Sequence, residues 1–258
     1  MKKTLLEKTA DKLVNAFVNN KIIAPLPKKF TKKLSEAQKL RKSCESKVKD
    51  PKIGFKAAGK GIAVMKKLKE KKPFYAAIFK KNFLKSGKKV KINKSTLGIE
   101  LEVCYLIKKS FFSSKGSITM KNVTKHISHM APCIEVIGYR QKKKGITSFG
   151  DLCSDFGANV KFLIGQKKKY KRINIGNLKT NISNKKIGQT VDGNTNTVYI
   201  NPLNSLKFVL NELKNDKVSL DKDFYVFTGS TVGVVPILGK GLYIGKVAQL
   251  GSAKTIIH

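Results

Sequence analysis

Apolar residues near the start of the chain recur at helical spacing. Five of them fall at i, i+4, i+7, i+8 and i+11, on one face of a helix: Leu6, Ala10, Leu13, Val14 and Phe17. A second helix is expected from about Ser35, which has capping-box spacing with Gln38, to Asp50-Pro51, because a residue before proline disfavours the helical region. These patterns predict a small helical lobe over residues 1–50.

Beyond Pro51 the chain changes to short apolar runs that favour β-strands. The predicted strands cover residues 52–56, 74–79, 98–107, 133–139, 160–165, 173–182, 195–200, 224–227, 234–238, 242–247 and 254–257. The turn pair Asp192-Gly193 precedes the strand expected at 195–200. One inserted helix is expected over 119–130, and another begins after Asn201, a capping residue followed by proline. The pattern therefore predicts an α+β chain whose residues 51–258 form a β-rich core.

Composition places the chain among globular proteins. It has 258 residues, of which 41% are hydrophobic, so it is long enough and apolar enough to bury a core. Four cysteines without a CxxC pair suit a reducing compartment. No apolar run approaches the roughly 20 residues that span a bilayer, and the charged start holds no signal-peptide apolar stretch. We expect a cytoplasmic protein without a membrane partner.

The charge of the chain is unusual, with 54 Lys and Arg against 16 Asp and Glu and a formal net charge of +38. Lysine is spread along almost the whole length. Nucleic-acid-binding proteins concentrate charge on one face and add aromatic residues or a known module, and neither pattern occurs here. A general lysine bias is therefore the preferred interpretation over a dedicated polyanion partner.

Because acidic residues are so few, their positions are informative. Glu100 and Glu102 lie in the clearest predicted strand, where alternation places both on one face and four neighbouring apolar residues on the other. Two carboxylates about 7 Å apart along a strand repel one another unless a cation lies between them. The pattern leaves two interpretations, a solvated face neutralised by lysines or a site for a hard divalent cation such as Mg²⁺ or Mn²⁺.

A third carboxylate, Glu135, stands in an otherwise apolar strand. An ionised glutamate among isoleucine and valine is costly without a partner. The residues leave three possibilities open: an ion pair with Arg140, an outward-facing position, or a share in a metal site with Glu100 and Glu102.

Two segments of this sequence resemble the 2-keto-4-pentenoate hydratase and 4-oxalocrotonate decarboxylase family of the fumarylacetoacetate hydrolase superfamily. They are Glu100-Leu101-Glu102 and Pro132–Arg140. Further matches follow in the order of that family: Ile53–Lys56, Ser154–Asn159 with Ile164-Gly165, Pro202–Leu206, Thr228-Gly229-Ser230 and Leu250-Gly251-Ser252. The matches span nearly the whole chain. The chain departs from the family at Phe74, which replaces an acid that some hydratases carry.

The resemblance implies a fold and a set of site residues. The expected fold is a mixed β-roll, of the type of the C-terminal domain of fumarylacetoacetate hydrolase, with a helical N-terminal lobe. The resemblance implies a Mg²⁺ or Mn²⁺ site at Glu100, Glu102 and Glu135. It also implies a catalytic Lys56 with Asp155 orienting that lysine or a metal-bound water. A substrate carboxylate is expected at Thr228, Gly229 and Ser230.

The activity implied is that of a lyase acting on a small α-keto acid. The main hypothesis is metal-dependent hydration of a 2-hydroxy-2,4-dienoate or 2-oxo-4-enoate to a 4-hydroxy-2-oxo acid. Decarboxylation of 4-oxalocrotonate is the alternative within the class, because both reactions use the same metal-stabilised dienolate. A basic nucleic-acid-binding protein on this fold and an inactive paralogue are the more remote alternatives. The resemblance also implies a homo-oligomer.

Overall fold

The computed structural model describes residues 2–59, 65, 73–143 and 145–258. Three helices form the start of the chain: α1 (Leu5–Asn19), α2 (Lys28–Lys32) and α3 (Leu34–Lys47). The apolar face predicted for the first helix is confirmed, since Ala10, Leu13 and Phe17 are buried. The capping box predicted at Ser35 is wrong, because α3 begins one residue earlier and Ser35 is already helical. A capping box does occur at the start of α1, between Thr4 and Glu7.

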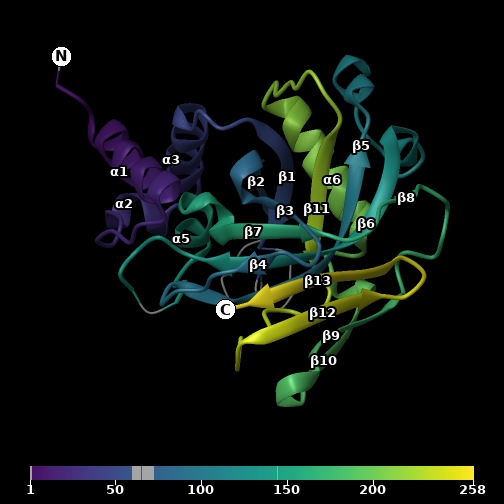
Figure 1. Cartoon of the computed structure of the whole chain (residues 1–258). Coiled ribbons are helices and arrows are strands. Elements are labelled where there is room, and N and C mark those ends of the chain that lie inside the picture. The colour runs from purple at the N-terminus through teal and green to yellow at the C-terminus, as the bar shows by residue number, and fades with distance from the viewer. Residues whose placement is uncertain (1, 60–64, 66–72, 144) are drawn as a thin grey trace.

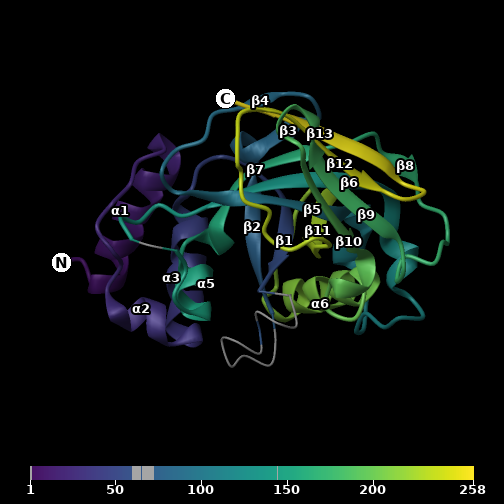
Figure 2. The same ribbon diagram turned by 90° about the horizontal axis from the view of Figure 1, so that it is seen from below.

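The core is built around a large mixed sheet with the order β2-β1-β11-β5-β6-β7-β3, and β8 pairs with β6. Its strands are β1 (Lys52–Ala58), β2 (Phe74–Phe79), β3 (Phe83–Lys85), β5 (Thr96–Ile107), β6 (Ile127–Gly138), β7 (Asn159–Ile164), β8 (Lys168–Lys169) and β11 (Phe224–Ser230). The longest pairing joins β5 to β6 in antiparallel register. Figures 1 and 2 show this sheet in the middle of the molecule, with α1, α2 and α3 together at one side.

A smaller sheet packs against the large one. Its order is β10-β9-β12-β13-β4, and its strands are β4 (Lys89–Val90), β9 (Lys179–Asn184), β10 (Gln189–Asn194), β12 (Gly241–Val247) and β13 (Gly251–Ile257). The contact is close at Gly245, where an added Cβ would lie 2.5 Å from the Leu101 side chain on β5. The smaller sheet therefore covers the face of β5 opposite to Glu100 and Glu102 (Figure 2).

Helix α6 (Pro202–Asn215) also lies against the large sheet, in contact with β11, β1 and β2. Its predicted start is confirmed, since the side chain of Asn201 accepts a hydrogen bond from the Asn204 amide at 3.0 Å. Leu206, Leu210 and Leu213 are completely buried. A short helix, α5 (Phe149–Ser154), packs instead on α2 and α3 and joins the helical lobe to the core. The remaining 3₁₀ turns span Lys80–Asn82, Lys109–Ser113, Val123–His126, Phe156–Ala158, Lys185–Ile187 and Thr195–Thr197.

The helix predicted over 119–130 is wrong. The segment has only a 3₁₀ turn at Val123–His126, after which β6 begins at Ile127. Apolar residues at i, i+4 and i+7 suit a helix, but pairing of Met130 with Tyr105 of β5 supplies partners that local spacing cannot indicate. His129, expected on that helix, therefore lies on a strand.

Two further strand predictions also fail. Residues 195–200 contain a 3₁₀ turn in place of the predicted strand. The predicted turn pair Asp192-Gly193 belongs to β10. The connection between β9 and β10 lies instead at Lys185–Ile187 and Gly188. Residues 234–238 form no strand, although Val235 makes an isolated bridge to Ile99. The strand predicted over 173–182 begins only at Lys179.

The overall class is nevertheless confirmed, an α+β fold with a curled mixed sheet and a helical N-terminal region. Among the described residues, no helix is long and apolar enough to cross a membrane.

Candidate metal and substrate site

Three carboxylates meet on one face of the large sheet because of the register between β5 and β6. Glu100 lies directly opposite Glu135, and Glu102 lies opposite Cys133. With a side-chain period of two, all three glutamates point to the same side. Their carboxylate oxygens lie within 4.8 Å of one another. Glu102 and Glu135 are completely buried, which contradicts the outward-facing position that the sequence left open for Glu135.

Lys56 approaches this cluster from β1. Strand β1 pairs with β11 in parallel, with Lys56 opposite Phe227, which brings the lysine to the face that carries the glutamates. Its ammonium forms an ion pair with the carboxylate of Glu135 and donates a hydrogen bond to the carbonyl of Gly157 at 3.1 Å. The possible ion pair between Glu135 and Arg140 is therefore not formed, because Lys56 takes that place.

Three carboxyl groups and one ammonium share this cluster, so ionised glutamates repel one another. Burial raises the pKa of Glu135 well above its ordinary value, and repulsion from Glu102 and Glu100 adds to the rise. Burial together with Glu102 raises the pKa of Glu100 to about 7, although Lys56 opposes the shift. For Lys56, burial lowers the pKa but attraction from the three carboxylates outweighs it, so the net shift is upward. Without a further cation these upward shifts favour protonated carboxyl groups, and a bound cation would favour the ionised form.

The geometry fits a hard divalent cation. Oε2 of Glu135 is buried and has no hydrogen-bond partner within the described part of the chain. A buried acceptor without a donor costs free energy, and a metal ion supplies what is missing. Mg²⁺ and Mn²⁺ prefer carboxylate oxygen and water as ligands, which matches the three glutamates.

The other predicted site residues lie at different distances from this cluster. The buried carboxylate of Asp155 accepts hydrogen bonds from the Arg140 amide at 2.6 Å and the Arg140 guanidinium at 2.7 Å. These bonds hold Asp155 to Arg140 and not to Lys56, so its assigned role stays a prediction. The amide of Gly229 donates to the carboxylate of Glu102 at 3.0 Å. The buried hydroxyl of Thr228 donates to the Val103 carbonyl at 2.8 Å.

A cavity of about 480 Å³ opens onto the glutamates. Its polar end is formed by Lys56, Glu100, Glu102, Gly229 and Ser230. Its walls are mostly apolar and include Leu97, Ile137, Ile146, Leu152 and Val234. Among the described lining residues, Lys56 is the only cationic side chain. The cavity thus combines a charged end with a largely apolar body.

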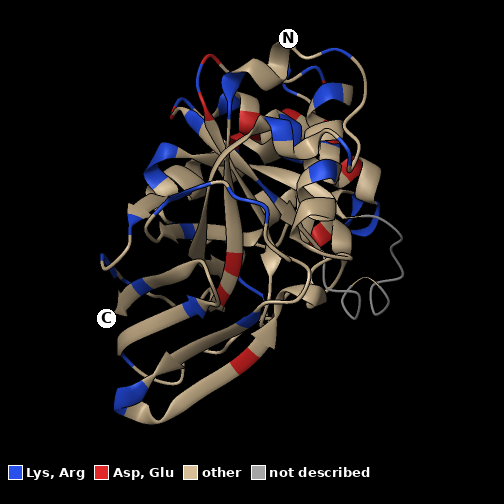
Figure 3. Cartoon of the chain, turned by 90° about the vertical axis from the view of Figure 1, so that its right-hand side faces the viewer, with Lys and Arg blue, Asp and Glu red and all other residues tan. Residues whose placement is uncertain are grey.

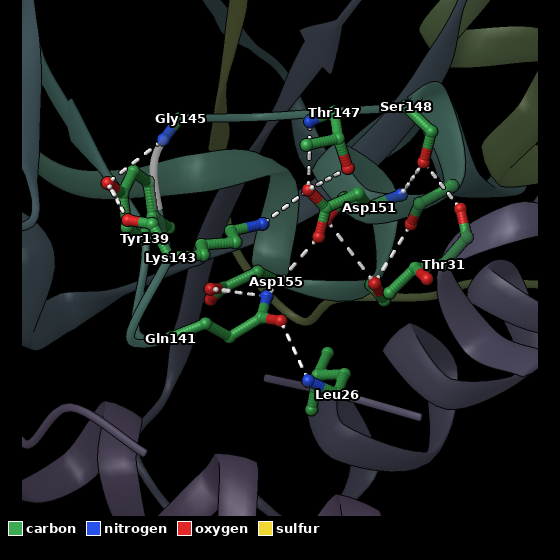
Figure 4. A network of polar contacts seen from close by, with 12 residues as sticks. Leu26, Thr31, Tyr139, Gln141, Lys143, Gly145, Thr147, Ser148, Asp151 and Asp155 are labelled. Atoms are coloured by element: carbon green, nitrogen blue, oxygen red, sulfur yellow. Dashed lines mark hydrogen bonds and ion pairs between the residues drawn. The ribbon is translucent and has the colours of Figure 1, made fainter. Parts of the chain in front are cut away.

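One wall of the cavity is anchored by a polar network. Asp151 of α5 accepts hydrogen bonds from the amide and hydroxyl of Thr147 at 3.1 and 3.3 Å and forms an ion pair with Lys143. The Ser148 hydroxyl donates to the Thr31 carbonyl of α2, as Figure 4 shows. Because Ile146 and Leu152 flank these residues, the network fixes both apolar side chains in the wall.

Sequence reasoning missed the contribution of Gly157. Its carbonyl is the second partner of Lys56, and it lies in a turn with left-handed backbone angles. The resemblance pointed to the aspartate of this segment, Asp155, whereas the direct contact comes from a backbone group two residues later. The glycine of Asp-Phe-Gly-Ala-Asn was the available signal, because a glycine in such a segment indicates a special backbone conformation.

Basic residues are not concentrated on one surface element. Figure 3 shows Lys and Arg in helices, strands and connections, and far fewer Asp and Glu. Within the described residues this spread is what a general lysine bias predicts, and the lack of a polyanion partner stays a prediction.

Comparison with known proteins identifies the fold. No established family profile matches the sequence, and no curated protein matches it. Among solved structures, 4-oxalocrotonate decarboxylase from Pseudomonas putida G7, complexed with magnesium and adipate, superposes with a TM-score of 0.84 at 18% identity, covering 100% of this chain and 99% of that one. Fumarylpyruvate hydrolase from Pseudomonas aeruginosa, in complex with Mn²⁺ and pyruvate, gives 0.59 at 12% identity, over 81% and 90% of the two chains. The fold expected from the resemblance is therefore confirmed.

Proposed function

We propose that this chain is a divalent-metal-dependent lyase of the fumarylacetoacetate hydrolase superfamily that acts on a short 2-oxo acid. The observation that carries the proposal is the cluster of Glu100, Glu102 and Glu135. Glu102 and Glu135 are buried, Glu100 and Glu102 line the cavity, and Lys56 is the only cationic side chain among the described lining residues. Structures with this fold that hold magnesium with adipate, or Mn²⁺ with pyruvate, support it.

The three glutamates would hold the metal, which when bound supplies a Lewis acid for the carboxylate and keto oxygen of the substrate. Lys56 then lies beside the reacting atoms. Its ammonium, held by Glu135 and the Gly157 carbonyl, carries the proton, and a bound cation would lower its pKa and so favour delivery of that proton to a carbon or oxygen of the substrate. The Gly229 amide fixes the carboxylate of Glu102, and Ser230 lines the cavity, with its hydroxyl donating to the Gly233 carbonyl at 2.7 Å; to bind a substrate carboxylate this hydroxyl would exchange that partner for the substrate.

Hydration of a 2-hydroxy-2,4-dienoate to a 4-hydroxy-2-oxo acid is the reaction that we favour. The apolar walls formed by Leu97, Ile137 and Leu152 suit a substrate whose far end is uncharged, because burying a second carboxylate there without a cation is costly.

Decarboxylation of 4-oxalocrotonate is the second candidate. It is supported by the likeness to 4-oxalocrotonate decarboxylase, which extends over the whole of this chain. Both reactions require the same metal-bound 2-oxo acid head and the same proton donor, so the site residues serve either.

A direct assay separates these possibilities. The purified chain, treated with EDTA and then reloaded with Mg²⁺ or Mn²⁺, is mixed with 2-hydroxypenta-2,4-dienoate or with 4-oxalocrotonate. Loss of dienol absorbance with formation of a 4-hydroxy-2-oxo acid indicates the hydratase, and release of CO₂ indicates the decarboxylase. Turnover that is unchanged by metal removal would contradict the proposal, as would a lack of turnover with either substrate.

The variant Glu102→Gln tests the metal ligands within the same assay. A neutral amide is a poorer ligand for a hard ion, so substrate binding and turnover should fall together, on the order of 10³-fold if several kcal/mol of charge stabilisation is lost. Glu36→Gln is the matched control, because Glu36 pairs only with lysines near the surface. A crystal soaked in Mn²⁺ should show one anomalous peak between the three glutamates; side chains pointing apart with no peak would refute the site.

We further propose a homo-oligomer. Several large apolar side chains are exposed, among them Leu238 at 72% and Ile200 at 62%. Light scattering should give a mass well above the 28.6 kDa of one chain. A measured mass equal to one chain refutes this part of the proposal.

A further inference from the structure

A strained turn lies directly beside the lysine of the site. Between α5 and β7, three consecutive residues have left-handed backbone angles: Phe156 (φ 52°), Gly157 (φ 65°) and Ala158 (φ 61°). Glycine adopts this region readily, but for other L residues it is disfavoured, and it normally occurs in single residues. Strained backbone persists only where the surroundings hold it, so the contacts of this turn indicate what it is for.

Arg140 grips both ends of the turn. At the entry its amide and guanidinium bind the Asp155 carboxylate at 2.6 and 2.7 Å, and at the exit its guanidinium donates to the Asn159 carbonyl. Within the turn, the Ala158 amide donates to the Asp155 carbonyl at 2.8 Å. One buried arginine therefore fixes the two points between which the left-handed residues run.

The helical lobe presses on the same turn. The ring of Phe17 on α1 stacks on the ring of Phe156, with centroids 4.3 Å apart and an interplanar angle of 24°. The guanidinium of Arg140 lies over both rings, 4.9 Å from the centroid of Phe17 and 5.5 Å from that of Phe156. Helix α1 therefore contacts the turn through the side chain of Phe156.

The turn presents the carbonyl of Gly157 to the site, where it accepts a hydrogen bond from Lys56 at 3.1 Å, and Ala158 lines the cavity beside it. The ion pair with Glu135 attracts the ammonium, but Glu135 is also a predicted metal ligand. The Gly157 carbonyl is neutral and belongs to the backbone, so it holds the ammonium without competing for a cation.

We propose that the left-handed turn at Phe156–Ala158, clamped by Arg140 and Phe17, is a positioning device for Lys56. Arg140 and Phe17 act through Gly157 and do not touch the reacting atoms, so they are positioning residues. The kinetic part of this inference rests on the proposed lyase function, whereas the geometric part does not.

The variant Gly157→Ala tests the device. An added Cβ would meet the Ala76 side chain at 3.2 Å, a tight contact that either Ala76 or the turn must relieve by a few tenths of an ångström. The matched control is Gly188→Ala, because Gly188 has the same φ of 65° but lies in an open hairpin with nothing within 4 Å of an added Cβ. Both variants carry the same backbone penalty, and only the first reaches Lys56.

Three measurements are made on each full-length variant. With the substrate that the parent chain turns over, kcat of Gly157→Ala should fall roughly 10²-fold, the loss typical of a reactive group misplaced by about 1 Å. KM and the Mn²⁺ affinity from calorimetry should stay within about threefold, because the carboxylates are not displaced. Acetylation of Lys56, followed by peptide-resolved mass spectrometry, should become faster. Gly188→Ala should match the parent in all three.

A second variant guards against misfolding of the first. Ala158→Gly relieves left-handed strain and adds no atoms, so its melting temperature should stay within about 3 °C of the parent, while kcat falls and Lys56 acetylation rises. The inference is overturned if Lys56 reactivity and kcat match the parent in both variants, or if both variants lose Mn²⁺ affinity along with activity. If the parent turns over no 2-oxo acid, the lyase proposal fails, and the acetylation rates still decide the positioning role.

Discussion

The cluster around Lys56 and the cluster around Arg140 are both buried and ionic, yet they differ in charge balance. Around Lys56, one ammonium faces three carboxylates, and Oε2 of Glu135 has no hydrogen-bond partner within the described residues. Around Arg140, one guanidinium faces the single carboxylate of Asp155, and hydrogen bonds reach both carboxylate oxygens. A balanced pair fixes geometry, whereas crowded carboxyl groups either hold protons or bind a further cation. The difference supports our proposal that the cluster around Lys56 is the site and the cluster around Arg140 supports it.

The largest expected effect concerns Lys56 itself. In Lys56→Met the bulk of the stem is kept and the proton donor is lost, so turnover should fall by about 10² to 10⁴-fold. Metal affinity should hold or rise slightly, because the glutamates lose a competing cation. Steady-state kinetics and Mn²⁺ calorimetry measure the two effects. Lys161→Met, a half-buried lysine on β7, is the control. Near-native turnover of Lys56→Met would show that Lys56 has no catalytic role.

Breaking the balanced cluster should cause the largest loss of stability. Arg140→Met leaves the carboxylate of Asp155 buried without its cation, which typically costs about 3–5 kcal/mol. Urea unfolding should report this loss with an unchanged m-value. The exposed Arg172→Met should change stability by less than about 0.5 kcal/mol. Equal stability of the two variants would mean that Arg140 does not hold the core together.

In the cluster around Lys56, removal of one carboxylate should not lower the stability of the chain, in contrast to the loss expected for Arg140→Met. In EDTA, Glu100→Gln removes one of three repelling carboxylates, so the melting temperature should stay level or rise by roughly 2–4 °C, the shift produced by about 1 kcal/mol. Asp155→Asn should lower it under the same conditions. With saturating Mn²⁺ the advantage of Glu100→Gln should disappear, because the parent gains more from binding. If the melting temperatures of both Glu100→Gln and Asp155→Asn fell in EDTA, the two clusters would not differ in the way proposed.

The smallest effects separate two neighbouring hydroxyls at the end of β11. Thr228→Val loses a buried hydrogen bond to Val103 and should cost about 1 kcal/mol of stability with KM unchanged. Ser230 lines the cavity, so Ser230→Ala should raise KM a few-fold, as expected for about 1 kcal/mol of binding, with little change in stability. If Thr228→Val instead raised KM alone, the substrate contact would belong to Thr228.

The sequence by itself determined the features that depend on local spacing and on ordered motifs. The face of α1 that carries Leu13 and Phe17 follows from a helical period, and the shared face of Glu100 and Glu102 follows from a strand period of two. The order of motifs along the chain indicated the curled mixed sheet. These signals lie within single elements or in their succession, so no knowledge of pairing is needed to read them.

Only the tertiary structure decided which charges meet. From the sequence, Glu135 had Arg140 five residues away as a candidate partner, but β6 ends at Gly138, and pairing of β1 with β11 brings Lys56 to Glu135 instead. Arg140 is left to Asp155, and the turn that follows is driven into the left-handed region. Residues 127–130 likewise became strand because β5 lies beside them. Each outcome depends on contacts between segments far apart in the chain, which periodicity within one segment cannot specify.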